Sequence, residues 1–170
     1  MSLTPLHLHL MFNHIPILGA IFLALLLAYA VWRNSPELQR LTLACTALVA
    51  VLTLPVYFTG EPAEEAIEHT PDYNEKLVEE HEDRGKITLI VVLVTGAAAV
   101  GALALARGGK SLRPGLVRLV LVGLVASSGI AAWTALNGGQ IRHPELRPGW
   151  TQPAGGEAGE AGEAGEAGKD

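Results

Sequence analysis

The sequence predicts an all-α integral membrane protein, a bundle of four transmembrane helices. Nearly half of the residues are apolar, the apolar residues gather in four long runs, and the charges lie in short stretches between these runs. A helix needs about 20 apolar residues to cross the roughly 30 Å hydrocarbon core of a bilayer. Each run is long enough, and the predicted helices cover residues 14–32, 41–58, 87–106 and 116–136.

These helices form one predicted transmembrane domain, residues 1–150, with an acidic outer loop at 59–86. In this loop, Gly60-Glu61-Pro62 resembles a helix start with proline at the first position. A second short helix is expected from Tyr73 to Asp83, so two acidic helices should cap the bundle. Residues 151–170 repeat Gly-Glu-Ala, and this acidic, low-complexity composition predicts a disordered tail.

Lysine and arginine residues indicate the orientation, because they collect in the cytoplasmic loops of membrane proteins. Residues 33–40 have an arginine at each end, and the loop at 107–113 carries two arginines and a lysine. Both loops are therefore predicted to be cytoplasmic, and both termini extracytoplasmic. The net charge of −5 comes mostly from the acidic loop and the tail, so it does not indicate nucleic-acid binding.

With this topology, all six histidines fall at or beyond the same membrane face. Three of them precede or open the first helix, two lie in the outer loop and one follows the fourth helix. In chain order they are His7, His9, His14, His69, His81 and His143. The simpler alternative is that histidine tolerates interfacial positions and that the outer segments are longer.

Carboxylates accompany these histidines. On a helix that starts at Gly60, Glu61, Glu65 and Glu68 would share a side with His69. Imidazole and carboxylate together suit zinc, copper or iron, and two imidazoles from different helices suit a haem. The paired Glu-x-x-His motifs of di-iron bundles and the Cys-x-x-Cys-His motif do not occur, so a b-type haem or a single metal ion is left. The alternative for the acidic residues is a solvated face.

The segment His9-Leu-Met-Phe-Asn-His14-Ile-Pro-Ile resembles the opening of the bacterial membrane family called domain of unknown function 2231. Further similar positions are Thr59-Gly60-Glu61, His81 and the segment from Gly138 to His143, although the proline that often follows the first histidine is missing. The resemblance implies a four-helix bundle of the bacterial inner (cytoplasmic) membrane. It also implies that His9, His14, His81 and His143 are the recurrent polar positions, with a suggested link to haem and cytochrome modules.

Two classes of function follow. The first is a redox-associated membrane subunit that binds a b-type haem or a Cu, Fe or Zn ion through His9, His14, His81 and His143. His7, His69, Glu61, Glu65 and Glu68 are secondary candidates for such a metal site. The second class is a non-catalytic assembly subunit whose acidic cap docks an extracytoplasmic partner.

Other functions have less support. Transport of a proton or cation is disfavoured, because no Asp, Glu or Lys lies in the middle of a predicted helix. An enzyme is the least supported class, because no catalytic motif occurs. The expected partners are the lipid bilayer, a cytochrome or other redox protein, and, in an oligomer, further copies of the chain. No nucleic-acid partner is expected.

Overall fold

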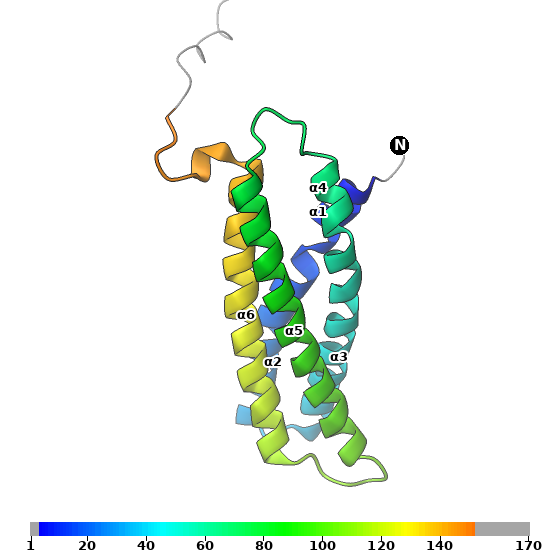
Figure 1. Cartoon of the computed structure of the whole chain (residues 1–170). Helices are drawn as coiled ribbons and strands as arrows, with labels where there is room; N and C mark the ends of the chain where they lie inside the picture. The colour runs from blue at the N-terminus through cyan, green and yellow to red at the C-terminus, as the bar shows by residue number, and fades with distance from the viewer. Residues whose placement is uncertain (1–3, 152–170) are drawn as a thin grey trace, which may run out of the picture.

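The structure, a computed structural model, describes residues 4–151, and in this range it is helical without strands. The elements are α1 (Pro5–Phe12), α2 (His14–Trp32), α3 (Pro36–Phe58), α4 (Gly60–Glu65), α5 (Glu75–Leu105), α6 (Pro114–Arg142) and the 3₁₀ helix η1 (Pro144–Leu146). α2, α3, α5 and α6 run along the bundle, and α1 and α4 lie together at one end (Figure 1). Apart from Thr151, the tail predicted for 151–170 lies outside the described residues.

Within residues 4–151, four helical segments are long and apolar enough to cross a membrane: Pro5–Trp32, Pro36–Glu65, Glu75–Leu105 and Pro114–Arg142. The predicted all-α four-helix bundle is therefore confirmed. The helices extend beyond the apolar runs because polar residues cap them. The side chain of Ser35 accepts a hydrogen bond from the N–H of Leu38 at the start of α3, and Asn74 does the same for Leu77 at the start of α5.

The helices close into a ring in the order α2, α3, α5 and α6, each packing against its two neighbours. The core contains large and small apolar side chains, among them Leu27, Leu43, Ala99, Val120 and Leu124. Large apolar side chains also cover the outside of the ring, including Phe22, Leu48, Val94 and Val122. An outer surface of this kind indicates contact with a lipid bilayer.

Threonines occupy many buried positions of the bundle without leaving an unpaired hydroxyl. Six of them donate a hydrogen bond to the carbonyl of the preceding turn: Thr42, Thr46, Thr53, Thr88, Thr95 and Thr134. The Oγ1 atoms of Thr88 and Thr134 also lie 2.8 Å apart and join α5 to α6. These hydroxyls therefore contribute to helix packing.

The prediction of a second, separate cap helix from Tyr73 to Asp83 was wrong. α5 begins at Glu75 and continues without interruption into its apolar part. Lys86 lies within 4 Å of Glu82, and Arg84 within 4 Å of Glu80, so ion pairs at helical spacing bridge the boundary between the acidic and apolar parts. The first cap helix forms as α4 but ends at Glu65, before Glu68 and His69.

Candidate functional site

Two histidines from different helices meet at the end of the bundle that carries α1 and α4. The ring centres of His9 on α1 and His81 on α5 are 6.5 Å apart, and the ring planes are almost perpendicular, at 79°. Both side chains are partly buried. His81 lies six residues before Ile87, the first residue of the predicted apolar run, which is on the order of 9 Å along the helix axis. The pair thus lies near one end of the apolar zone.

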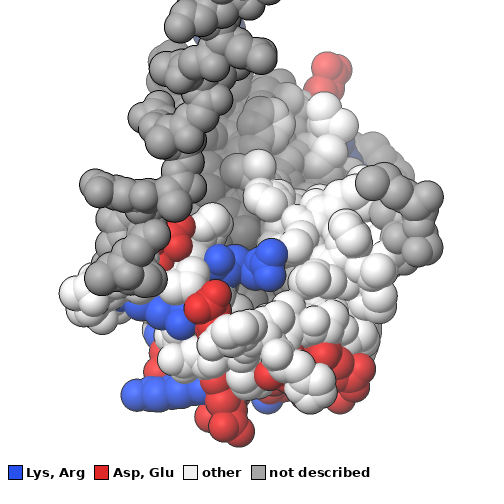
Figure 2. Space-filling view, turned by 90° about the horizontal axis from the view of Figure 1, so that it is seen from above, with Lys and Arg blue, Asp and Glu red and all other residues white. Residues whose placement is uncertain are grey.

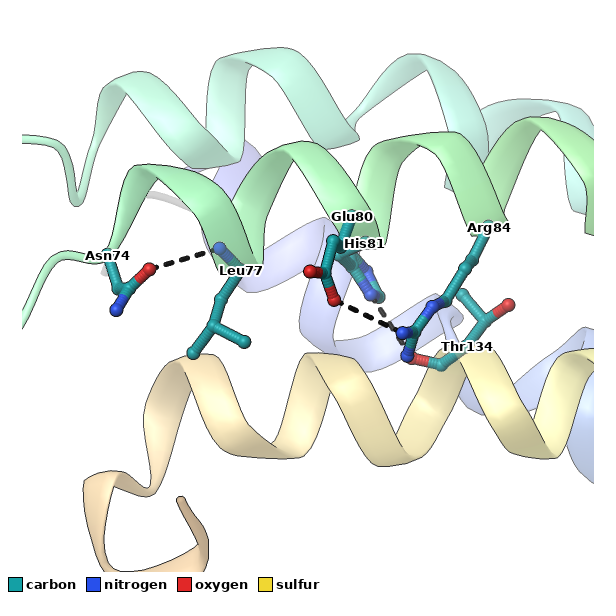
Figure 3. Close-up of polar contacts among 6 residues, drawn as sticks. All are labelled: Asn74, Leu77, Glu80, His81, Arg84 and Thr134. Atoms are coloured by element: carbon teal, nitrogen blue, oxygen red, sulfur yellow. Dashed lines mark hydrogen bonds and ion pairs between the residues drawn. The ribbon is translucent and has the colours of Figure 1, made fainter. Parts of the chain in front are cut away.

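Each of the two rings is held by a backbone carbonyl. Nδ1 of His9 lies 3.0 Å from the carbonyl oxygen of Val56. Nδ1 of His81 lies 3.2 Å from the carbonyl oxygen of Thr134 (Figure 3). A carbonyl oxygen only accepts, so in each case Nδ1 carries the hydrogen and donates it. Neither Nε2 is hydrogen-bonded to a described residue. In the neutral rings both Nε2 lone pairs are therefore free to bind a ligand, as in metal-binding histidines.

The surroundings of the two rings are alike. The His9 ring bonds to Val56 and lies beside Gly60, four residues later, whose added Cβ would be 3.8 Å from Cε1 of the ring. The His81 ring bonds to Thr134 and lies against Gly138, again four residues later. Thr134 and Gly138 share one face of α6, whereas Val56 near the end of α3 and Gly60 at the start of α4 lie on either side of Thr59. Each histidine thus contacts a carbonyl and a glycine four residues apart, and we call these two arrangements the half-sites.

The other four histidines do not join this pair. The side chains of His7, His14, His69 and His143 are exposed. Nδ1 of His143 donates to Glu145 at 2.9 Å. The backbone N–H of Glu145 itself, and after it this bond from His143, lower the pKa of the Glu145 carboxyl. Among residues 4–151, no group of three or more His, Cys, Asp or Glu side chains is placed to hold a metal ion. Of the four main candidates, the structure brings together His9 and His81.

The carboxylates of this end lie mostly at its surface. Glu61, Glu65 and Glu68 are exposed, and Glu68 lies 3.4 Å from Nε2 of His69. Seen from above, acidic and basic side chains are both visible at this end, scattered among uncharged residues (Figure 2). Nearer to the pair, Arg84 donates to Glu80 at 3.2 Å and lies over the ring of Trp133, 4.2 Å from its centre. Glu80 therefore balances the charge of Arg84 close to His81.

Tyr73 fastens the loop between α4 and α5. Its hydroxyl donates to Oε1 of Glu64 at 2.9 Å, and this hydrogen bond is the main reason why the pKa of Tyr73 rises to about 12. Because the bond stabilises the neutral phenol, its contribution to stability is complete below the ordinary pKa of 10.0 and is lost as the pH rises through about 12. Arg147 supports the same loop by donating to the carbonyl of Asp72 at 3.0 Å.

An absorbance titration of the tyrosines checks this contact. The difference between the wild type and Tyr73→Phe isolates Tyr73, and its midpoint is expected near pH 12. In Glu64→Gln the midpoint should fall towards 10, because the charged acceptor is lost. A wild-type midpoint already near 10 would show that the contact does not form in solution.

Two residues near the end of α6 had a weaker signal in the sequence. Gly138 was part of the family resemblance, but its contact with His81 depends on how α5 packs against α6. Asn137 precedes Gly138, and its side chain is only 2% exposed. The spacing of Thr134, Asn137 and Gly138 was the available signal, since these positions share one helix face.

Fold and site together define a four-helix membrane bundle with a pair of partly buried histidines at one end. No protein-family model matches the chain, and neither a curated protein nor a solved structure matches it.

Proposed function

We propose that the protein is a redox-associated membrane subunit that binds a b-type haem or a transition-metal ion through His9 and His81. One observation carries the proposal: two imidazoles from different helices lie in edge contact, and each is oriented by a backbone carbonyl that leaves Nε2 free. A bound haem or redox metal would supply one-electron chemistry at this end of the bundle. The polypeptide would fix the tautomer and direction of both rings.

The distance between the rings is about that expected of two imidazoles that bind one metal ion. With a metal–nitrogen bond of about 2 Å, such imidazoles would have ring centres up to about 6 Å apart. The observed separation is 6.5 Å. A haem iron needs only two protein ligands, and His9 and His81 supply that number. A metal ion without a porphyrin would need donors beyond histidine, cysteine and carboxylate, because no third side chain of these types joins the pair within residues 4–151.

We further propose that this end of the bundle is extracytoplasmic, in a bacterial inner membrane, and that a cytochrome or other redox protein approaches it there. The arginines and the lysine of the two short loops gather at the opposite end of the bundle, which supports this orientation. Arg40 closes that end by donating to the carbonyls of Ala106 and Lys110. Membership of the family called domain of unknown function 2231 is proposed on the resemblance alone.

The test is an absorption spectrum of oxidised and dithionite-reduced protein in detergent, with elemental analysis of the same sample. We expect either a Soret band or about one transition-metal ion per chain. His9→Ala and His81→Ala should each abolish this cofactor signal, because each variant lacks one of the two histidine ligands. His7→Ala and His69→Ala are matched controls, since both rings are exposed and away from the pair, and they should bind as the wild type does.

Two results would contradict the proposal. One is a wild-type protein with neither a Soret band nor stoichiometric metal, which would favour the docking function of the acidic cap. The other is a cofactor that survives in the His9→Ala/His81→Ala double variant.

A further inference from the structure

Besides the two Nε2 atoms, the region of the histidine pair contains buried oxygen atoms without partners. Within residues 4–151, the buried side-chain polar atoms that lack a hydrogen bond are Oδ1 of Asn137 and Oδ1 of Asn13. Asn137 lies on α6 between Thr134 and Gly138, the two residues that contact His81. Asn13 follows His9 by four residues in a continuous helical turn, and its N–H donates to the carbonyl of His9. Both orphaned oxygens therefore lie on the segments that hold the pair.

Comparison of the half-sites gives Asn137 a specific place. Thr59 follows Val56 by three residues, just as Asn137 follows Thr134. The Thr59 hydroxyl donates to the carbonyl of Pro55 at 2.8 Å, and Oγ1 lies 3.4 Å from Nδ1 of His9, so its capacity is used. Asn137 is 2% exposed, and its Oδ1 has no such partner. A buried acceptor without a hydrogen-bond donor is unfavourable, and a ligand that supplies a donor or a positive charge would satisfy Asn137.

All four atoms offer lone pairs. The two Nε2 atoms accept, because their rings carry the hydrogen on Nδ1, and the two amide oxygens accept as well. A group that satisfies them must bring positive charge or hydrogen-bond donors. Arg84 does not fill this role, because Glu80 and Trp133 already hold its guanidinium group.

We propose that Asn137 Oδ1 is the third protein donor of the His9–His81 site, and that the site takes a hydrated divalent transition-metal ion. Imidazole nitrogen suits Zn²⁺, Cu²⁺, Ni²⁺ and Fe²⁺, and an amide oxygen adds a harder donor, so the set favours a divalent ion over Cu⁺. Water completes the coordination, and its hydrogens are the donors that a second acceptor such as Asn13 requires. This inference rests on the proposed function. Of the two cofactors named there, a haem and a metal ion, it specifies the metal ion without a porphyrin.

The test measures binding of Zn²⁺ and of Cu²⁺, each alone, to the metal-stripped full chain in detergent without a polyhistidine tag. We expect one ion per chain. Asn137→Leu should weaken binding about 10–100-fold, while its thermal stability without metal stays equal or rises, because the unpaired acceptor is gone. Asn137→Asp should bind more tightly than the wild type, because an anionic oxygen replaces a neutral one. Ser127→Ala, which removes another buried polar side chain from α6, is the matched control and should bind normally.

The outcomes separate this inference from the proposed function. If binding needs both histidines but Asn137→Leu binds as the wild type does, the role of Asn137 is wrong and the histidine site stands. Stoichiometric haem that Asn137→Leu retains would also overturn the inference and support the haem form of the proposed function. If the wild type binds neither metal nor haem, both fail.

Discussion

Replacing Gly96 by alanine is expected to lower the free energy of unfolding by about 2 kcal/mol. Gly96 is buried where α5 packs against α3, and an added Cβ would meet the Cβ of Ala50 closer than two carbon atoms approach each other. Ala50 has no rotamer through which to move away, so the two helices must separate. Unfolding in detergent, followed by circular dichroism or tryptophan fluorescence, measures the effect.

Two variants make this prediction specific. Gly101→Ala lies on the same helix with no atom within 4 Å of the new Cβ, so it should be neutral or slightly stabilising. Ala50→Gly removes the opposing carbon, so the Gly96→Ala/Ala50→Gly double variant should regain much of the lost stability. Such recovery is the coupling expected of residues in contact. Equal stability of Gly96→Ala and Gly101→Ala would show that α3 and α5 do not pack as described.

The transmembrane helices were predictable because a long apolar run is a local property of the chain. The ends of these helices were less predictable, because hydropathy indicates where the membrane begins and not where a helix ends. At Ile87 the composition changes from acidic to apolar, yet the backbone of α5 continues through this point from Glu75. Capping by Asn74 and ion pairs at helical spacing sustain the polar turns. The change from aqueous to lipid surroundings at Ile87 is therefore not a helix boundary.

The histidine pair was only half predictable. The sequence predicted His9 and His81 at one end of the bundle. Which histidine rings come into contact depends on how separate helices pack, and no local sequence pattern encodes this packing. One signal was available. His9 and His14 are five residues apart, which at 3.6 residues per turn places them on different sides of a helix. Accordingly, His14 is exposed while His9 is partly buried.

Replacing Gly138 by alanine is expected to abolish or severely weaken ligand binding while the bundle stays folded. The new Cβ would lie 2.7 Å from Cε1, 3.1 Å from Nδ1 and 3.4 Å from Nε2 of the His81 ring. A side chain can rotate where a backbone cannot, so the ring should leave the Thr134 carbonyl and lose its position opposite His9. We expect the affinity to fall by about 10–100-fold or more, because a loss of this size follows when the groups that orient a metal ligand are removed. The Zn²⁺ and Cu²⁺ titrations and the haem spectrum measure it.

Two other glycines test whether the effect depends on this one contact. At Gly139 the nearest atom to an added Cβ is Cδ1 of Leu146 at 3.9 Å, so Gly139→Ala should bind normally. Gly60 holds the equivalent place in the His9 half-site, but there the added Cβ is an ordinary 3.8 Å from the ring, so Gly60→Ala should also be tolerated. Suppose that only Gly138→Ala loses binding and that its unfolding transition is unchanged. The ring of His81 must then be a ligand, and it must bind from its position against α6. Unchanged binding in Gly138→Ala would instead separate His81 from the site.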